Sequence, residues 1–145
     1  MRAGGFIIPL EQVISFALRN ATNLSGELER LGTDSPDPKT LDNCLILDCL
    51  VTARSFAEAR HKGVGVVPVG YPEYKEGCQL TLMVVTHLKP FPFRRFEAID
   101  RDHSRLEPFV PGEHEARVKA VLEEEYGFTD VIFTTAFVSD SFFSE

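Results

Sequence analysis

Apolar residues recur with helical spacing near the start of the chain. Behind Pro9, which suits the first turn of a helix, apolar side chains repeat on one face through about Arg19. Polar residues and Gly26 interrupt this pattern, which resumes through residues 27–31. The pattern predicts a first helix that breaks near residue 20 and continues for a few more residues.

A second helix is predicted behind the segment 32–39, GTDSPDPK, which is rich in turn-forming residues. Asp37 before Pro38 matches a helix N-cap followed by proline at the first helical position. The helix is therefore expected over about 39–61. Its middle, CLILDCLVTA, is apolar almost all round, which is typical of a helix packed on more than one side.

The second half of the chain changes to the pattern of strands. β-Branched and aromatic residues dominate four segments, 64–70, 79–88, 94–100 and 130–138. Pro68 has no amide to donate, which favours an edge position for the first of these strands.

A third helix is predicted over about 112–127, between the last two strands. Gly127 matches the residue that ends a helix in the left-handed conformation. One helical face is apolar and the other is acidic; the apolar face consists of Val118, Val121, Leu122 and Tyr126.

The predicted order is helix, helix, three strands, helix, strand, with short connections that favour antiparallel neighbours. Residues 1–145 are expected to form a single α+β domain of two layers, with helices packed on a mostly antiparallel sheet of about four strands.

Charge and cysteine content narrow the class of protein. The net charge of −7 argues against a nucleic-acid partner, which requires a broad basic surface. No signal peptide and no apolar stretch of membrane-spanning length is present, so we expect a cytoplasmic protein without a membrane partner. The three cysteines include no C-x-x-C pair, and we expect no cofactor and no bound metal.

The leading candidate site surrounds the loop between the second and third strands. His87, Lys89, Arg94 and Arg95 form a cationic group beside the sequence Phe91-Pro92-Phe93. Arginine binds carboxylate or phosphate with two parallel hydrogen bonds, so this corner could receive an anionic small molecule or an acidic protein segment. The alternative is that the arginines of this group neutralise acids of the third helix.

A second candidate site is the stretch AIDRDHSR, residues 98–105. Asp100, Asp102 and His103, completed by His114, have the oxygen and nitrogen ligands that a divalent cation prefers. This pattern would suit a small metal-dependent hydrolase, but charged turns after a strand are common and usually only solvated. If 79–88 and 94–100 form a hairpin, the two candidate sites lie about 23 Å apart and cannot be one.

Two further features stay open at this point. Asp48 is either a general acid or base or a member of a polar stripe with Thr52 and Arg54. Phe142 and Phe143 either close the core or dock on a second subunit of a homo-oligomer. No nucleophile elbow, phosphate loop, paired metal-ligand motif or dinucleotide fingerprint is present, so a binding module is the leading interpretation and a metal-dependent hydrolase the alternative.

Overall fold

The computed structural model describes residues 1–61, 65–70, 80–90 and 107–138. Along these residues the elements are β1 (Arg2–Ile8), α1 (Leu10–Asn20), η1 (Thr22–Leu24), α2 (Ser25–Leu31), η2 (Pro38–Thr40), α3 (Asn43–Arg60), β2 (Gly65–Gly70), β3 (Leu80–Lys89), α4 (Glu113–Glu124) and β4 (Ile132–Phe137). The strands form one antiparallel sheet in the order β2-β3-β1-β4. The predicted α+β class, with helices on an antiparallel sheet of four strands, is confirmed.

The predicted order lacks the strand β1, which occupies an interior position of the sheet. Two adjacent glycines weaken its strand pattern, yet the structure requires both. A Cβ on Gly5 would lie 2.1 Å from the carbonyl oxygen of Val84, where the register of β1 against β3 shifts. A Cβ on Gly4 would lie 2.7 Å from the ring of Phe109. Close backbone approach therefore explains residues that strand propensity alone disfavours.

The strand β3 pairs with a neighbouring strand on each of its two sides. Between Leu80 and Val85, β3 pairs with β2 on one side and from Leu82 onward with β1 on the other. Residues 94–100, the other strand of the predicted hairpin, lie outside the described residues. The strand β2 is at the sheet edge, as Pro68 predicted.

The helix boundaries follow their capping residues. The first helix breaks after Asn20, as predicted, and α2 resumes the helical course. The long helix α3 begins later than predicted, because Asp42 is its cap and accepts a hydrogen bond from the amide of Cys44 at 2.8 Å. Asp37 caps only the short turn η2, through the amide of Lys39. Two N-cap signals lie close together, and the second begins the helix.

The helix α3 buries one face rather than several, which corrects the prediction from its apolar composition. Its buried residues are Leu45, Ile46, Cys49, Leu50 and Ala53. On the opposite face Leu47 is 51% exposed and Val51 is 63% exposed. Asp48 is exposed too, so it belongs to the solvent-facing side of the helix.

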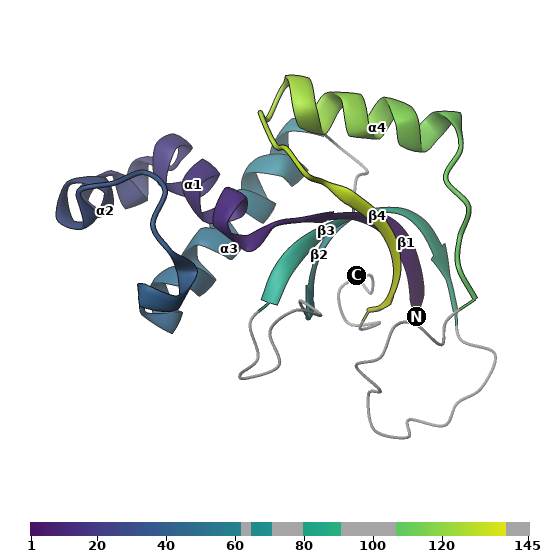
Figure 1. The fold of residues 1–145 in the computed structure, drawn as a ribbon, viewed down its shortest axis with the longest axis horizontal. Coiled ribbons are helices and arrows are strands. Elements are labelled where there is room, and N and C mark those ends of the chain that lie inside the picture. Colours follow the sequence, from purple (N-terminus) through teal and green to yellow (C-terminus); the bar gives the residue numbers. More distant parts are fainter. Residues whose placement is uncertain (62–64, 71–79, 91–106, 139–145) are drawn as a thin grey trace.

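The described helices lie on one side of a strongly curved sheet, with α4 crossing above it and α1 and α3 beside it (Figure 1). The larger apolar core lies between these helices and the sheet. A second buried cluster lies on the other face of the sheet; it consists of Ala3, Ile7, Val67, Val69, Met83, Ala136 and Val138. Among the described residues, none of the helices is long and apolar enough to cross a membrane.

Candidate functional site

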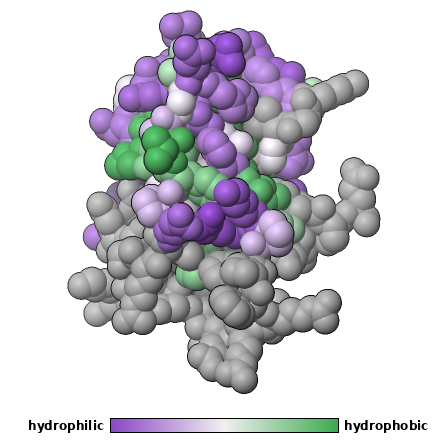
Figure 2. Space-filling view, turned by 90° about the vertical axis from the view of Figure 1, so that its right-hand side faces the viewer, coloured by the Kyte–Doolittle hydropathy of each residue, from purple (hydrophilic) through white to green (hydrophobic). Residues whose placement is uncertain are grey.

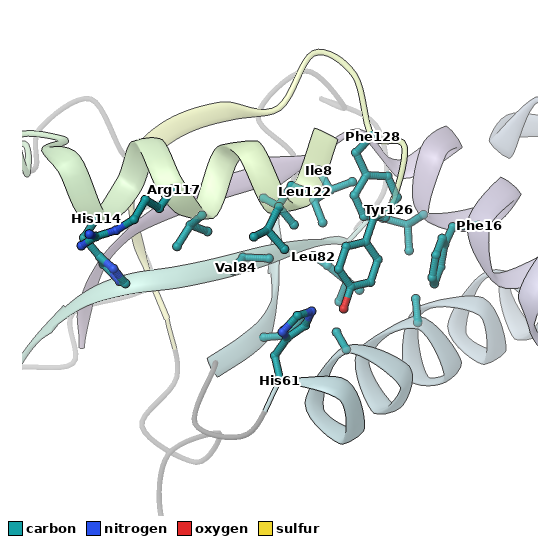
Figure 3. Close-up of a pocket in the computed structure, with 16 residues that line it drawn as sticks. Ile8, Phe16, His61, Leu82, Val84, His114, Arg117, Leu122, Tyr126 and Phe128 are labelled. Carbon is teal, nitrogen blue, oxygen red and sulfur yellow. The ribbon is translucent and has the colours of Figure 1, made fainter. Parts of the chain in front are cut away.

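A cavity of about 220 Å³ lies among α1, α3, α4 and the sheet (Figure 3). Its lining is almost wholly apolar and comes from Ile8, Val13, Phe16, Ala53, Ala57, Val66, Leu82, Val84, Val118, Val121, Leu122 and Phe128. Four polar side chains complete it, and they are His61, His114, Arg117 and Tyr126. An apolar cavity with a few polar groups is the usual form of a small-molecule site.

Small side chains and loose helix packing leave this space. Ala53 and Ala57, one helical turn apart on α3, present only methyl groups to the cavity. The backbones of α1 and α3 pack closely with each other, whereas α4 stays farther from its neighbours. The space between α3 and α4 is therefore filled incompletely.

One end of the cavity carries cationic and hydrogen-bonding side chains from α4. His114, Arg117 and Val121 follow at intervals of three and four residues, so they form one stripe along the helix. His114 and Arg117 are both exposed, which marks this end as open to solvent. Among the described residues, Arg117 has no ion-pair or hydrogen-bond partner, so its guanidinium is available to a ligand.

The other polar pair, His61 and Tyr126, lies where the C-terminal ends of α3 and α4 meet. The ring centroids of the two side chains are 5.7 Å apart. Glu125 lies 3.5 Å from both Arg60 Nε and His61 Nε2, and Arg60 lies over the Tyr126 ring at 6.0 Å. Burial raises the pKa of the Tyr126 hydroxyl, and Glu125 adds to this rise against the opposing charge of Arg60. The hydroxyl therefore stays protonated at neutral pH.

A separate corner surrounds Phe109, near the C-terminal end of β3. The ring of His87 stacks on Phe109 at 5.1 Å, and Arg2 and Lys89 lie over the same ring at 4.7 and 5.7 Å. Arg2 also pairs with Glu107 at 3.1 Å. Figure 2 views this end of the molecule and shows a band of hydrophobic surface among hydrophilic areas; Val110, next to Phe109, is 81% exposed.

His87 faces a buried carboxylate rather than solvent alone. Its Nδ1 lies 3.1 Å from Oε1 of Glu115, whose side chain is only 4% exposed. Burial raises the pKa of the Glu115 carboxyl, but hydrogen bonds from the backbone amides of Gly112 and Glu115 and the charge of His87 outweigh burial and hold that pKa below its usual value of 4.5.

The predicted site residues are thus divided between two places. His87 and Lys89 share the Phe109 corner, and Arg2 joins them although the sequence analysis did not select it. His114 lies instead at the cavity. The remaining candidates, Arg94, Arg95, Asp100, Asp102 and His103, lie outside the described residues, as do Phe142 and Phe143. Within the described ranges, no three His, Cys, Asp or Glu side chains are grouped so that they could hold a metal ion.

His61 and Arg117 were not predicted as site residues from the sequence, and Tyr126 was predicted only as part of a packed helix face. A signal for Arg117 was present, because His114, Arg117 and Val121 have helical spacing beside the apolar stripe. No comparable signal linked His61 to Tyr126, since 64 positions separate them and only the fold brings them together.

These features define a small α+β domain with an apolar cavity under a loosely packed helix. Comparisons of the chain with protein families, with curated proteins and with solved structures found no match.

Proposed function

We propose that this domain binds a small organic anion whose apolar part occupies the cavity and whose anionic group stays at the open end, beside Arg117 and His114. The observation that carries the proposal is an apolar cavity bordered by an arginine with no partner among the described residues. Guanidinium groups suit carboxylate and phosphate groups because their donors match two oxygens at once.

The acidic character of the chain is compatible with an anionic ligand. The net charge of −7 weakens attraction over long distances, but salt screens charges beyond about 8 Å at physiological ionic strength. The groups within that distance of the ligand therefore decide its binding. At the open end these include the Arg117 guanidinium and the ring N–H of His114.

The cavity volume limits the ligand to about one ring. A dry apolar cavity of about 150 Å³ is known to accept benzene. A cavity of about 220 Å³ has room for a ring with a short substituent. Phenylacetate, which joins one ring to a carboxylate, is therefore a suitable probe, and 2-phenylethanol is its uncharged counterpart.

The test is a titration of the protein with each probe, in which NMR chemical shifts of the protein report binding. For ten non-hydrogen atoms, a Kd of about 1 mM is expected. Replacing Arg117 by Gln should weaken phenylacetate binding about fivefold, a loss of about 1 kcal/mol for an exposed ion pair, and should leave 2-phenylethanol nearly unchanged. The control is Lys119→Gln, which removes a cation paired with Glu123 at 3.6 Å elsewhere on α4.

A second pair of variants tests whether the ligand enters the cavity. Ala57→Leu fills space at the lining, whereas Ala59→Leu adds the same atoms to an exposed position of α3. Ala57→Leu should abolish binding of both probes, and Ala59→Leu should not affect it. If neither probe binds the wild-type protein, or if Ala57→Leu binds both as well as Ala59→Leu does, the proposal is wrong.

A further inference from the structure

The inner end of the cavity contains two buried polar atoms without hydrogen bonds to described residues. They are the hydroxyl oxygen of Tyr126 and Nε2 of His61, and both side chains line the cavity. Nε2 lies 3.5 Å from the Glu125 carboxylate but makes no hydrogen bond to it. Buried polar groups in proteins nearly always have a hydrogen-bond partner, so two such atoms in one apolar cavity require an explanation.

The directions of the two side chains suggest one partner for both. Figure 3 shows the Tyr126 hydroxyl pointing down toward His61 and α3, at the end of the cavity away from His114 and Arg117. The neighbouring lining, Phe16 and Ala57 among it, offers no hydrogen-bonding side chain. A group that bonds both atoms must therefore come from something inside the cavity.

We propose that Tyr126 and His61 form a recognition site for a hydroxyl group on the ring of the bound anion. The ligand class is then a hydroxyaryl carboxylate or a similar phenolic anion. A phenolic hydroxyl both donates and accepts, so it can pair with the Tyr126 hydroxyl and with His61 Nε2 together. This inference rests on the proposed function, and it adds the polarity of the ligand's buried end.

The dimensions of α4 agree with such a ligand. Arg117 and the end of the helix at Glu124 are separated by about 10 Å along the axis, at roughly 1.5 Å per residue. Tyr126 follows two residues later, and its ring and the Arg117 side chain both contribute to the cavity wall. A single ring with a carboxylate on one side and a hydroxyl on the other suits this interval.

The test compares three phenylacetates that differ only at the ring position opposite the carboxylate. Phenylacetate has hydrogen there, 4-hydroxyphenylacetate a hydroxyl, and 4-methylphenylacetate a methyl group of similar size. The wild-type protein should bind the hydroxyl compound roughly three- to tenfold tighter than the methyl compound, as one hydrogen bond predicts. Tyr126→Phe removes a single oxygen, and it should lower this ratio, because only the contact with His61 is then left.

The Arg117→Gln variant serves as the matched control at the other end of the cavity. It should weaken all three compounds by a similar factor and keep the ratio of hydroxyl to methyl compound as in the wild type. His61→Gln should lower the ratio in part, because Gln keeps a hydrogen-bonding group. Thermal melting of each variant shows whether it is folded.

The outcomes separate this inference from the proposal on which it rests. If all three compounds bind with equal affinity, or if Tyr126→Phe and His61→Gln both leave the preference for the hydroxyl unchanged, the polar pair does not recognise the ligand and only the anion-binding function stands. If none of the three binds the folded wild-type protein, the proposed function fails, and the recognition site fails with it.

Discussion

The buried carboxylate of Glu115 connects α4 to the sheet, and its replacement by Gln should destabilise the protein in a pH-dependent way. Its Oε2 accepts a hydrogen bond from the Gly112 amide at 2.7 Å, which satisfies the N-terminus of α4, and its Oε1 lies 3.1 Å from His87 Nδ1. Helix caps contribute about 1 kcal/mol and hydrogen bonds to a charged group about 1.5 to 3 kcal/mol. Gln keeps an oxygen for the amide but loses the charge, so we expect a loss of about 1 to 2 kcal/mol at pH 7.

The sign of the pH dependence follows from the pKa of Glu115. This pKa is lower in the folded chain than its usual value of 4.5. The stabilisation by the carboxylate is therefore complete above about pH 4.5, and it is lost as the pH falls from there through the folded pKa. Gln does not titrate, so the difference in unfolding free energy between wild type and Glu115→Gln should shrink below pH 4.5.

Urea denaturation from pH 7 to pH 3 measures this difference directly. The control is Glu124→Gln, an exposed carboxylate on the same helix, which should change stability by less than about 0.5 kcal/mol. A difference between wild type and Glu115→Gln that stays constant from pH 5.5 to pH 3 would refute the assignment of a lowered pKa to this carboxyl. A difference no larger than that of Glu124→Gln would refute the anchoring role itself.

Three further predictions concern other parts of the chain. Gly5→Ala should destabilise the protein by roughly 3 kcal/mol, because the new methyl group meets the Val84 backbone. Gly26→Ala lies in open space on a helix and should stabilise the protein by about 0.5 to 1 kcal/mol. Urea denaturation measures both changes. Burial raises the pKa of Cys49 to about 11, and the charges of Asp48 and Glu27 add to this rise. At pH 8 iodoacetamide should therefore modify the exposed Cys44 and spare Cys49 in the folded protein. Peptide mass spectrometry measures which cysteine is modified. If Asp100, Asp102, His103 and His114 form the alternative metal site, Mg²⁺, Mn²⁺, Zn²⁺ or Ca²⁺ should raise the melting temperature; our proposal uses no metal and predicts no shift.

The sequence predicted most of the elements because their hydrophobic patterns are strong and local. The strands β2, β3 and β4 and the helix α4 lie within a few residues of their predicted positions. The amide of Phe128 bonds the Leu122 carbonyl behind α4, and Gly127 is left-handed, as predicted. The strand β1 was not predicted because Gly4 and Gly5 weaken its strand pattern. These glycines are required by contacts with Phe109 and Val84, which are distant in the sequence. Local propensity carries no information on such contacts.

The candidate site was less predictable for the same physical reason. Charge patterns identified His87 and Lys89 as neighbours of one corner, but not the Glu115 carboxylate that faces His87 from α4. The cavity is the space that side chains from six elements leave unfilled, so it depends on the tertiary packing. Ala53 and Ala57, which line it, cannot be distinguished in the sequence from ordinary helix-forming residues. The apolar sequence of α3 also led to a wrong prediction of burial on several sides, because Leu47 and Val51 face outward.

Polar contacts at its two ends explain how α4 can border a cavity without collapsing into it. At the first turn Glu115 bonds the Gly112 amide and faces His87, and beyond the last turn Glu125 lies near Arg60 and His61. The contacts with His87, Arg60 and His61 join the two ends of α4 to β3 and to the end of α3, whereas apolar packing alone would favour closer approach. The middle of α4 is then free to present Val118 and Val121 to an open space. The proposed ligand would lie between these two anchors, with its anion near the first and its hydroxyl near the second.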